Sequence, residues 1–292
     1  MRKYGVPYKG SKSAIAPWVV EHLPPAETLV DLFAGGCAVT DCAMDSGKWK
    51  RFIINDIEGD ITQLFIDAVS GKYKGNNTWV SRETFELLKG CDPFVRYCWS
   101  FGNNGRDYIY ARELEPYKKA VHELLHCETV QGRRLMYRTA IRALEQYLIT
   151  TGKYIGAPQR QNLTSLECLQ SLERLERLER LESLERLQSF ERLQRYNCDY
   201  QDVPIPPDSV IYCDIPYKGT NAYGKSKKGN FDYDRFYDWA ERQTQPVIIS
   251  EYWMPEERFE VIAECEKTSI ISATANNKVI EHLYKPRRAN NV

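Results

Sequence analysis

The segment Ser209–Tyr217, S-V-I-Y-C-D-I-P-Y, combines the residue types most suited to chemistry in this chain. An apolar run delivers in succession the Asp214 carboxylate, the Ile215 backbone carbonyl, Pro216 and the Tyr217 ring. Two hydrogen-bond acceptors therefore precede an aromatic face, and the proline stiffens the turn between them. The alternative interpretation is an ordinary turn that ends a strand.

A second candidate is the glycine-bearing turn D-L-F-A-G-G, Asp31–Gly36. Gly35 and Gly36 allow the backbone to approach a ligand closely, while Asp31 stands at the end of an apolar run. Ligands of open parallel sheets bind in the crevice at this end of the strands. The turn lacks the three-glycine phosphate fingerprint G-x-G-x-x-G, which disfavours a dinucleotide.

An α/β unit is expected to position this turn. The apolar run Thr28–Phe33 predicts a strand, Cys37–Asp45 a helix and Arg51–Asn55 a second strand, closed by Asp56. This order implies parallel pairing of the two strands. Asp56 is then placed to accept hydrogen bonds from ribose hydroxyls, with a helix cap or a turn residue as the alternative.

The C-terminal third also contains short apolar runs that predict strands. Its predicted strands are Ser209–Cys213, Pro246–Glu251, Thr268–Ala273 and Lys278–Tyr284. The last two predict a hairpin, because only a short turn separates them. The expected fold is α/β, a doubly wound sheet that ends in an antiparallel hairpin and carries a mainly helical insertion in its middle.

These motifs carry a family resemblance. D-I-P-Y resembles the [DNS]-P-P-[YFW] motif of amino-group methyltransferases that use S-adenosylmethionine, and the chain resembles a Dam-type DNA adenine-N6 methyltransferase of the D12 class. Tyr8–Lys12, Y-K-G-S-K, resembles the family's aromatic-x-G-x-K opening, D-L-F-A-G-G its cofactor loop and Asn55-Asp56 its ribose-binding pair. The motif order is that of the family's α group.

The resemblance implies a Rossmann-like catalytic domain that binds S-adenosylmethionine, formed by residues 1–60 and 205–292, and a target-recognition insertion at 61–204. The implied catalytic residues are Asp214, Ile215, Pro216 and Tyr217. The implied cofactor-binding residues are Tyr8, Lys12, Asp31, Phe33, Gly35, Gly36 and Asp56. Two positions depart from the family pattern: Ile215 replaces a proline, and Cys37 stands where a second glycine is common.

The proposed chemistry can be argued from the groups themselves. An exocyclic amine on a purine is a poor nucleophile because its lone pair is spread into the ring. If Asp214 and the Ile215 carbonyl accept both amino hydrogens, the nitrogen becomes pyramidal and its lone pair can point at the sulfonium methyl. Tyr217 would offer a stacking face to a base flipped out of duplex DNA.

Basic residues outside these motifs are candidates for DNA contact. The stretch Phe101–Tyr108 resembles an Asn/Gly/Arg segment of the family, the tract Lys218–Tyr237 predicts a mobile loop, and several arginines share roughly one helix face. The expected DNA-contacting residues are Asn104, Arg106, Arg133, Arg134, Lys225, Lys227 and Lys228. The alternatives are a solvated surface for the lysines and an internal salt-bridge network for the arginines.

Leucine or phenylalanine recurs at every third position from Leu163 to Leu193. On an α-helix such a stripe drifts around the axis, whereas a 3₁₀ helix would align it but seldom runs beyond four residues. Glu–Arg pairs at a spacing of four favour the α form. We predict a helical arm at 163–193, with a spacer that has no DNA-contacting role as the alternative.

Composition limits the remaining classes. The chain has 292 residues, 42% hydrophobic residues, and 40 basic residues against 40 acidic ones, which suits a folded enzyme and not a protein that coats nucleic acid nonspecifically. Nine cysteines without a C-x-x-C pair and four histidines do not favour a zinc site, and we expect no metal. The chain shows no membrane-spanning run, so we expect a cytoplasmic protein. The family resemblance implies a bacterial or phage-encoded enzyme.

Other functions stay open at this point. A cytosine-N4 methylase uses a similar catalytic turn, and a non-catalytic DNA-binding or scaffolding protein could keep a degenerate methylase fold. Cytosine-ring chemistry is disfavoured because no Pro-Cys pair occurs. Double-stranded DNA is the expected partner, and the resemblance allows a cognate restriction nuclease.

Overall fold

The computed structural model describes residues 2–152, 180–181, 183–184, 190–217, 231–272 and 275–287, without the side chains of 267–272 and 275–278. The described residues form two compact units. The first unit draws on residues 1–6, 10–71 and 184–292, and the second on residues 7–9 and 72–183.

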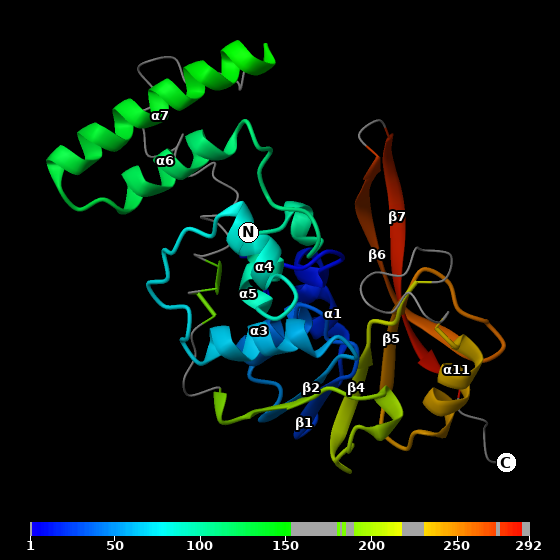
Figure 1. The fold of residues 1–292 in the computed structure, drawn as a ribbon. Coiled ribbons are helices and arrows are strands. Elements are labelled where there is room, and N and C mark those ends of the chain that lie inside the picture. The colour runs from blue at the N-terminus through cyan, green and yellow to red at the C-terminus, as the bar shows by residue number, and fades with distance from the viewer. Residues whose placement is uncertain are drawn as a thin grey trace, which may run out of the picture. The chain divides into compact units, whose positions relative to one another are not determined.

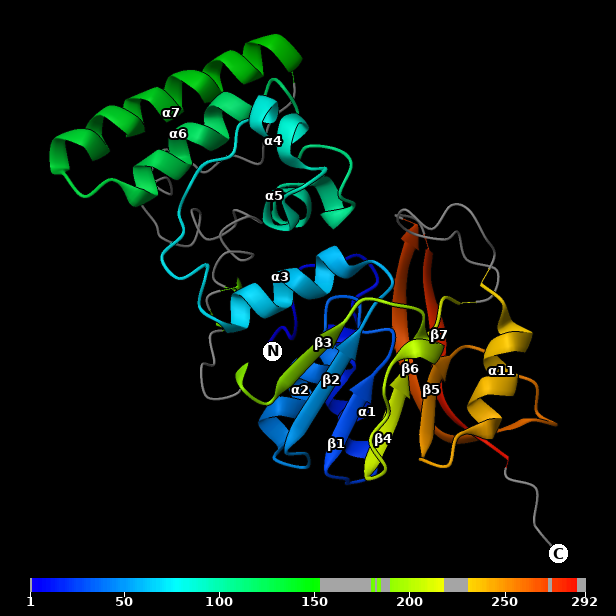
Figure 2. The ribbon, with the colours of Figure 1, turned by 60° about the horizontal axis from the view of Figure 1, so that its bottom comes forward.

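The first unit is built on a seven-stranded sheet in the order β3-β2-β1-β4-β5-β7-β6 (Figures 1 and 2). The strands are β1 Thr28–Asp31, β2 Arg51–Asn55, β3 Leu193–Tyr196, β4 Ser209–Cys213, β5 Val247–Glu251, β6 Phe259–Ser272 and β7 Ala275–Pro286. Neighbours from β3 to β5 pair in parallel, whereas β7 pairs antiparallel with both β5 and β6. The predicted α/β fold with a C-terminal hairpin is confirmed.

The opening unit lies where the sequence predicts it. Strands β1 and β2 and the helix α2, Ala38–Ser46, match the predicted elements to within two residues at each end. The hairpin is longer than predicted, because β6 already begins at Phe259 and β7 continues to Pro286. Figures 1 and 2 show it reaching beyond the neighbouring strands.

The core of the first unit forms where the central strands are covered on both faces. All residues of β1, β4 and β5 are buried, as expected for parallel strands between two layers of helices. Helix α11, Tyr233–Arg242, adds Phe236, Trp239 and Ala240 to this core. The other helical elements of the unit are η1 Lys12–Ala14, α1 Ala16–His22, α3 Gly59–Val69 and η4 Tyr200–Asp202.

The second unit is helical in its described part. Its elements are α4 Arg82–Leu88, α5 Pro93–Cys98, η2 Phe101–Asn103, α6 Glu115–His126 and α7 Val130–Thr151. Helices α6 and α7 lie side by side and bury Ala120, Val121 and Ala140 between them (Figure 2). No helix within the described ranges is long and apolar enough to cross a membrane.

The leucine repeat needs a correction at its C-terminal end. Leu193 belongs to no helical arm: it begins β3 and pairs with Phe52 of β2. Side chains of a strand alternate between its two faces, so a single apolar residue such as Leu193 is compatible with the first position of a strand. Most of the repeat lies outside the described residues, although Leu181 and Leu184 are buried. Because β3 completes the sheet, residues 193–196 belong to the first unit and not to the expected insertion.

Candidate active site

Three aspartates meet at the carboxyl edge of the sheet. The register places Asp31 of β1 opposite Ile54 of β2 and Tyr212 of β4. Asp56 directly follows β2 and Asp214 directly follows β4, so both emerge at the same edge. The negative charge of Asp214 acts on both other carboxyl groups and contributes to raising their pKa values.

The glycine turn after β1 relies on left-handed backbone. Gly35 has φ 46° and Cys37 has φ 57°, and the Cys37 N–H donates to the Ala34 carbonyl at 2.6 Å. Cys37 therefore occupies a conformation that glycine would adopt at a lower cost. Its side chain is buried at the start of α2, so the departure from the family's second glycine is accommodated within the turn.

The N-terminal segment closes over this turn through Gly5. The Val6 N–H donates to the Gly36 carbonyl at 2.8 Å, and the Gly5 N–H donates to Oδ2 of Asp41 at 2.8 Å. Gly5 has φ 68°, and a Cβ on it would come within 2.2 Å of the Gly36 oxygen. Only glycine permits this approach. The sequence analysis did not identify Gly5, because no motif near Gly5 in the sequence indicates its contact with the Gly36 backbone.

Asp31 is a buried acid with capacity for a further partner. Its Oδ2 accepts a hydrogen bond from Oγ1 of Thr40 at 2.7 Å, whereas its Oδ1 is buried without a hydrogen-bond partner among the described residues. Burial raises the pKa of Asp31 to about 7, against the opposing effect of the Thr40 hydrogen bond. An unpartnered buried oxygen is costly unless a ligand supplies the donor.

Asp56 ties the second strand to the glycine turn. Its Oδ2 accepts from the Gly35 N–H at 2.8 Å and its Oδ1 from the Glu58 N–H at 2.8 Å. Burial raises the pKa of Asp56 to about 6, and these two hydrogen bonds oppose that rise. The carboxylate is thereby held in one orientation beside the turn.

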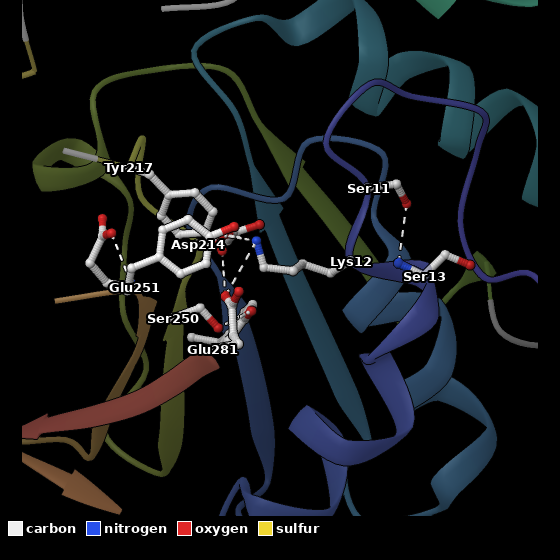
Figure 3. Close-up of polar contacts among 10 residues, drawn as sticks. Ser11, Lys12, Ser13, Asp214, Tyr217, Ser250, Glu251 and Glu281 are labelled. Atoms are coloured by element: carbon white, nitrogen blue, oxygen red, sulfur yellow. Dashed lines mark hydrogen bonds and ion pairs between the residues drawn. The ribbon is translucent and has the colours of Figure 1, made fainter. Parts of the chain in front are cut away.

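A charged network surrounds the turn after β4 (Figure 3). Nζ of Lys12, from η1, lies 2.6 Å from Oδ1 of Asp214 and 3.7 Å from Oε1 of Glu281, from β7. The same ammonium lies 4.5 Å from the centre of the Tyr217 ring. The Tyr217 hydroxyl donates to Oε1 of Glu281. Burial, followed by the charges of Asp214 and Glu281, raises the pKa of Tyr217, so its hydroxyl stays protonated and remains a donor.

Glu281 is the second residue that sequence reasoning missed. Its side chain is fully buried, and it alternates along β7 with the exposed Ile280. Leu283, two residues on and also fully buried, faces the same side of the sheet. The sequence did offer a signal for Glu281: an acidic residue at a position that shares its face of the strand with the apolar Leu283.

The remaining residues of the predicted catalytic turn and cofactor loop are structural neighbours of this network. Ile215 is buried, and the Pro216 carbonyl accepts a hydrogen bond from the Tyr233 hydroxyl at 2.9 Å. The Phe33 ring packs against Tyr200 and Phe236 in the core of the first unit. The first unit thus brings together all but one of the predicted catalytic and cofactor-binding residues.

Tyr8 is the exception, because it belongs to the second unit. Its ring meets Tyr97 edge-on, with the ring centres 5.8 Å apart.

The expected DNA-contacting residues that the structure describes also lie in the second unit. Asn104 holds a turn, because its Oδ1 accepts from the N–H groups of Arg106 and Asp107. Arg106, Arg133 and Arg134 are exposed, and Nε of Arg133 donates to the Cys127 carbonyl at 2.6 Å. The expected contacts Lys225, Lys227 and Lys228 lie outside the described residues.

Comparison with known families adds an independent finding. The sequence model of the family described as D12 class N6 adenine-specific DNA methyltransferase matches residues 8–285. The match spans nearly the whole chain, including Lys12, both aspartate-bearing strand ends, the turn at Asp214 and Glu281. No curated protein matches the chain.

Proposed function

Because the chain belongs to the D12 class N6 adenine-specific DNA methyltransferases, we propose that the carboxyl edge of its sheet holds the methyl donor beside the target amine, with Asp214 gripping that amine. The family makes the protein an enzyme that transfers a methyl group to adenine N6 in DNA. It favours this activity over the cytosine-N4 and scaffolding alternatives, and it implies S-adenosylmethionine as the methyl donor.

The residues at the turn after β1 fit such a donor. Gly35 supplies a backbone with little bulk, Asp31 has a buried oxygen without a partner, and Asp56 is oriented by two backbone N–H groups. We assign the donor's ribose hydroxyls to Asp56 and the close backbone contact to Gly35 and Gly36. Phe33 serves the site by anchoring the turn in the core. The motif position of Tyr8 and Lys12 adds them to this set.

The observation that carries the proposal is the pairing of β1 with β4. Their parallel register brings the Asp214 turn to the same sheet edge as the glycine turn. S-adenosylmethionine, when bound, supplies an electrophilic methyl group on a sulfonium. Asp214 and the Ile215 carbonyl accept the two amino hydrogens, orient the nitrogen lone pair and stabilise the positive charge that forms on the nitrogen.

Tyr217 completes the base pocket in this proposal. Its hydroxyl is tied to Glu281 and its ring lies beside that of Tyr252, with the ring centres 4.4 Å apart. A fixed aromatic face replaces part of the stacking that a base loses when it flips out of duplex DNA, a cost of a few kcal/mol. The ring therefore favours the flipped base without reading its sequence.

The part of the expected insertion, 61–204, that belongs to the second unit, residues 72–183, supplies target recognition in the same proposal. Support comes from the exposed arginines Arg133 and Arg134 on α7 and from Arg106 beside the Asn104 turn. Guanidinium groups pair with phosphates and with guanine edges, so these side chains have the chemistry for duplex DNA.

The enzyme's setting belongs to the proposal as well. We infer a bacterial or phage-encoded enzyme, with a cognate restriction nuclease as a candidate partner. Long-read sequencing of host DNA would report the methylated base and its context together. A nuclease that cuts the same sequence only when it is unmethylated would identify the partner.

Transfer of a radioactive methyl group from S-adenosylmethionine to unmethylated genomic DNA tests the central assignment, with the nucleosides identified by mass spectrometry. Wild type should form N6-methyladenine, and Asp214→Asn should lower the transfer rate at least about 100-fold, since it removes the charge that stabilises the amine. Asp208→Asn is the matched control, because Asp208 precedes the same strand at its other end. Equal rates for wild type and Asp214→Asn would remove Asp214 from the mechanism.

A further inference from the structure

The network at the catalytic turn contains one acid more than the proposed chemistry requires. Asp214 suffices to grip the substrate amine, yet Glu281 lies next to it with a fully buried side chain. Burying a carboxylate is expensive unless cations and hydrogen-bond donors surround it. The Lys12 ammonium at 3.7 Å and the Tyr217 hydroxyl are such partners.

Lys12 creates a conflict that the second acid can resolve. Its ammonium lies 2.6 Å from Oδ1 of Asp214 and 4.5 Å from the Tyr217 ring centre. The proposed function assigns these two groups, the carboxylate and the ring face, to the substrate base. A lysine that stays there competes for the Asp214 oxygen and repels the positive charge that develops on the attacking nitrogen.

Charge balance shows what Glu281 changes. Lys12 and Asp214 form a neutral pair, so Lys12 cancels the charge that Asp214 would offer to a cationic amine. With Glu281 the three side chains carry one net negative charge, and Lys12 has a second carboxylate within reach. The 8% exposure of the Lys12 side chain means that water screens these interactions only weakly.

We propose that Glu281 is a positioning residue for methyl transfer: its carboxylate draws the Lys12 ammonium away from Asp214 and leaves the Asp214 carboxylate to the substrate amine. This inference rests on the proposed function, because it takes Asp214 as the group that grips the amine. Glu281 acts through Lys12 and is not expected to touch the base.

A purely structural role for Glu281 predicts a different order of variants. Glu281→Gln keeps the size of the side chain and an acceptor for the Tyr217 hydroxyl but removes the charge. Glu281→Asp keeps the charge but shortens the side chain by one methylene, which leaves a small void in the buried site. The proposal predicts faster methyl transfer in Glu281→Asp than in Glu281→Gln, whereas a packing or hydrogen-bonding role predicts the reverse.

The test is single-turnover transfer from radioactive S-adenosylmethionine to unmethylated genomic DNA, with each variant saturated in donor and DNA. Glu281→Gln should lower the rate about tenfold or more, with donor affinity within about threefold of wild type. Glu281→Asp should keep more than about a tenth of the wild-type rate. Equal rates for the two variants, or a faster Glu281→Gln, would overturn the proposal.

Removal of the competing cation supplies a second readout. Lys12→Met in the Glu281→Gln background takes away the charge that holds Asp214. Because Lys12 is also assigned to the donor site, donor affinity is measured for the double variant and the rate is taken at saturating donor, where it should exceed that of Glu281→Gln alone. A double variant that is equal or slower would contradict the proposal. If circular dichroism shows that Glu281→Gln does not fold, Glu281→Asp decides the outcome. A transfer rate of Glu281→Asp below about a tenth of the wild-type rate would then overturn the proposal.

Asp214→Asn, measured beside these variants, distinguishes a failure of the proposed function from a failure of the role proposed for Glu281. If Asp214→Asn is as fast as wild type, the proposed function itself fails. If Asp214→Asn is inactive while Glu281→Gln matches wild type, only the role of Glu281 fails.

Discussion

At the carboxyl edge of the sheet, charged side chains are buried against one another, whereas along α7 they are exposed. Asp31, Lys12 and Glu281 each have less than a tenth of their surface accessible and are surrounded by groups of the same unit. Helix α7 buries only Ala140, and along its described length Arg133 and Arg134 are exposed.

The contrast separates two tasks. Methyl transfer needs groups whose orientation is set before the substrate arrives, and burial with fixed partners achieves this at the sheet edge. Recognition of a polyanion needs cations that stay solvated until they meet phosphate. Among the described residues, the apolar side chains of Val130, Leu135 and Ile149 on α7 are exposed as well.

The largest effect is expected at Gly5, where the N-terminal segment contacts the glycine turn of the proposed donor site. Gly5→Ala forces a Cβ to within 2.2 Å of the Gly36 oxygen and places alanine at φ 68°. We expect a loss of about 3 kcal/mol in the free energy of unfolding, measured by urea denaturation. Calorimetry should detect no donor binding.

Gly47→Ala is the matched control, since Gly47 has φ 70° but nothing within 4 Å of the added Cβ. It should cost about 1 kcal/mol and leave donor binding intact. A Gly5→Ala protein as stable as this control would show that the close approach is unimportant.

Next in size is a pH-dependent effect at Asp31. Because burial raises its pKa to about 7, the folded protein holds a proton that the unfolded chain releases near pH 4, so stability falls as pH rises from about 4 to 7. Asp31→Asn removes this loss. Relative to wild type, the variant should gain about 2 kcal/mol of unfolding free energy between pH 5.5 and pH 8.5, measured by urea denaturation.

Asp67→Asn on α3 provides the comparison, because Asp67 accepts a hydrogen bond from Gln63 in the preceding turn of its own helix. Its stability relative to wild type should stay constant over the same range. If Asp31→Asn behaves in the same way, the buried charge at Asp31 has no energetic consequence.

A smaller effect is expected for donor affinity at Asp56. With its pKa raised to about 6, Asp56 gains a proton as pH falls below 6 and then has less capacity to accept hydrogen bonds from ribose. Binding of S-adenosylhomocysteine, measured calorimetrically, should weaken about tenfold from pH 7.5 to pH 5.0.

Asp56→Asn should bind more weakly at pH 7.5 and respond less to pH. Asp45→Asn, at the far end of α2, should keep the wild-type profile. A profile that is unchanged in Asp56→Asn would assign the titration to another group.

The smallest effect is expected on α7. Arg133→Ala and Arg134→Ala should each weaken DNA binding a few-fold near 0.1 M salt and reduce the slope of log affinity against log salt by about 1. The transfer rate at saturating DNA should not change. Lys50→Ala is the control, because Lys50 is 80% exposed and lies in the first unit, directly before β2.

A salt slope that is unchanged in both arginine variants would remove α7 from the DNA-binding surface. A change in the saturated transfer rate would instead connect α7 to the chemistry and weaken the contrast with the sheet edge.

The central strands could be predicted from the sequence because each is a short apolar run that needs burial on both faces. The acids Asp31, Asp56 and Asp214 followed from their places at strand ends. Parallel pairing of the first two strands was predicted, and the register confirms it. The pairing of β4 with β1, which brings Asp214 to the same edge, was found only in the structure.

Gly5 and Glu281 could not be predicted in this way. Each gains its role from a segment that is distant in sequence: Gly5 from the carbonyl of Gly36, and Glu281 from Lys12. The helical prediction for Leu193 was wrong for a related reason. The leucine repeat continues into β3, and only the pairing of β3 with the distant strand β2 makes this residue part of a strand. Local patterns predict elements well, whereas contacts between distant elements depend on register.

A crystal structure with S-adenosylhomocysteine tests the central claim most directly. We expect the ligand to lie over the Gly35–Gly36 turn, with its ribose at Asp56 and its sulfur facing the side of the Asp214 carboxylate. A sulfur atom directed away from Asp214, or a ligand bound elsewhere on the sheet, would contradict the account.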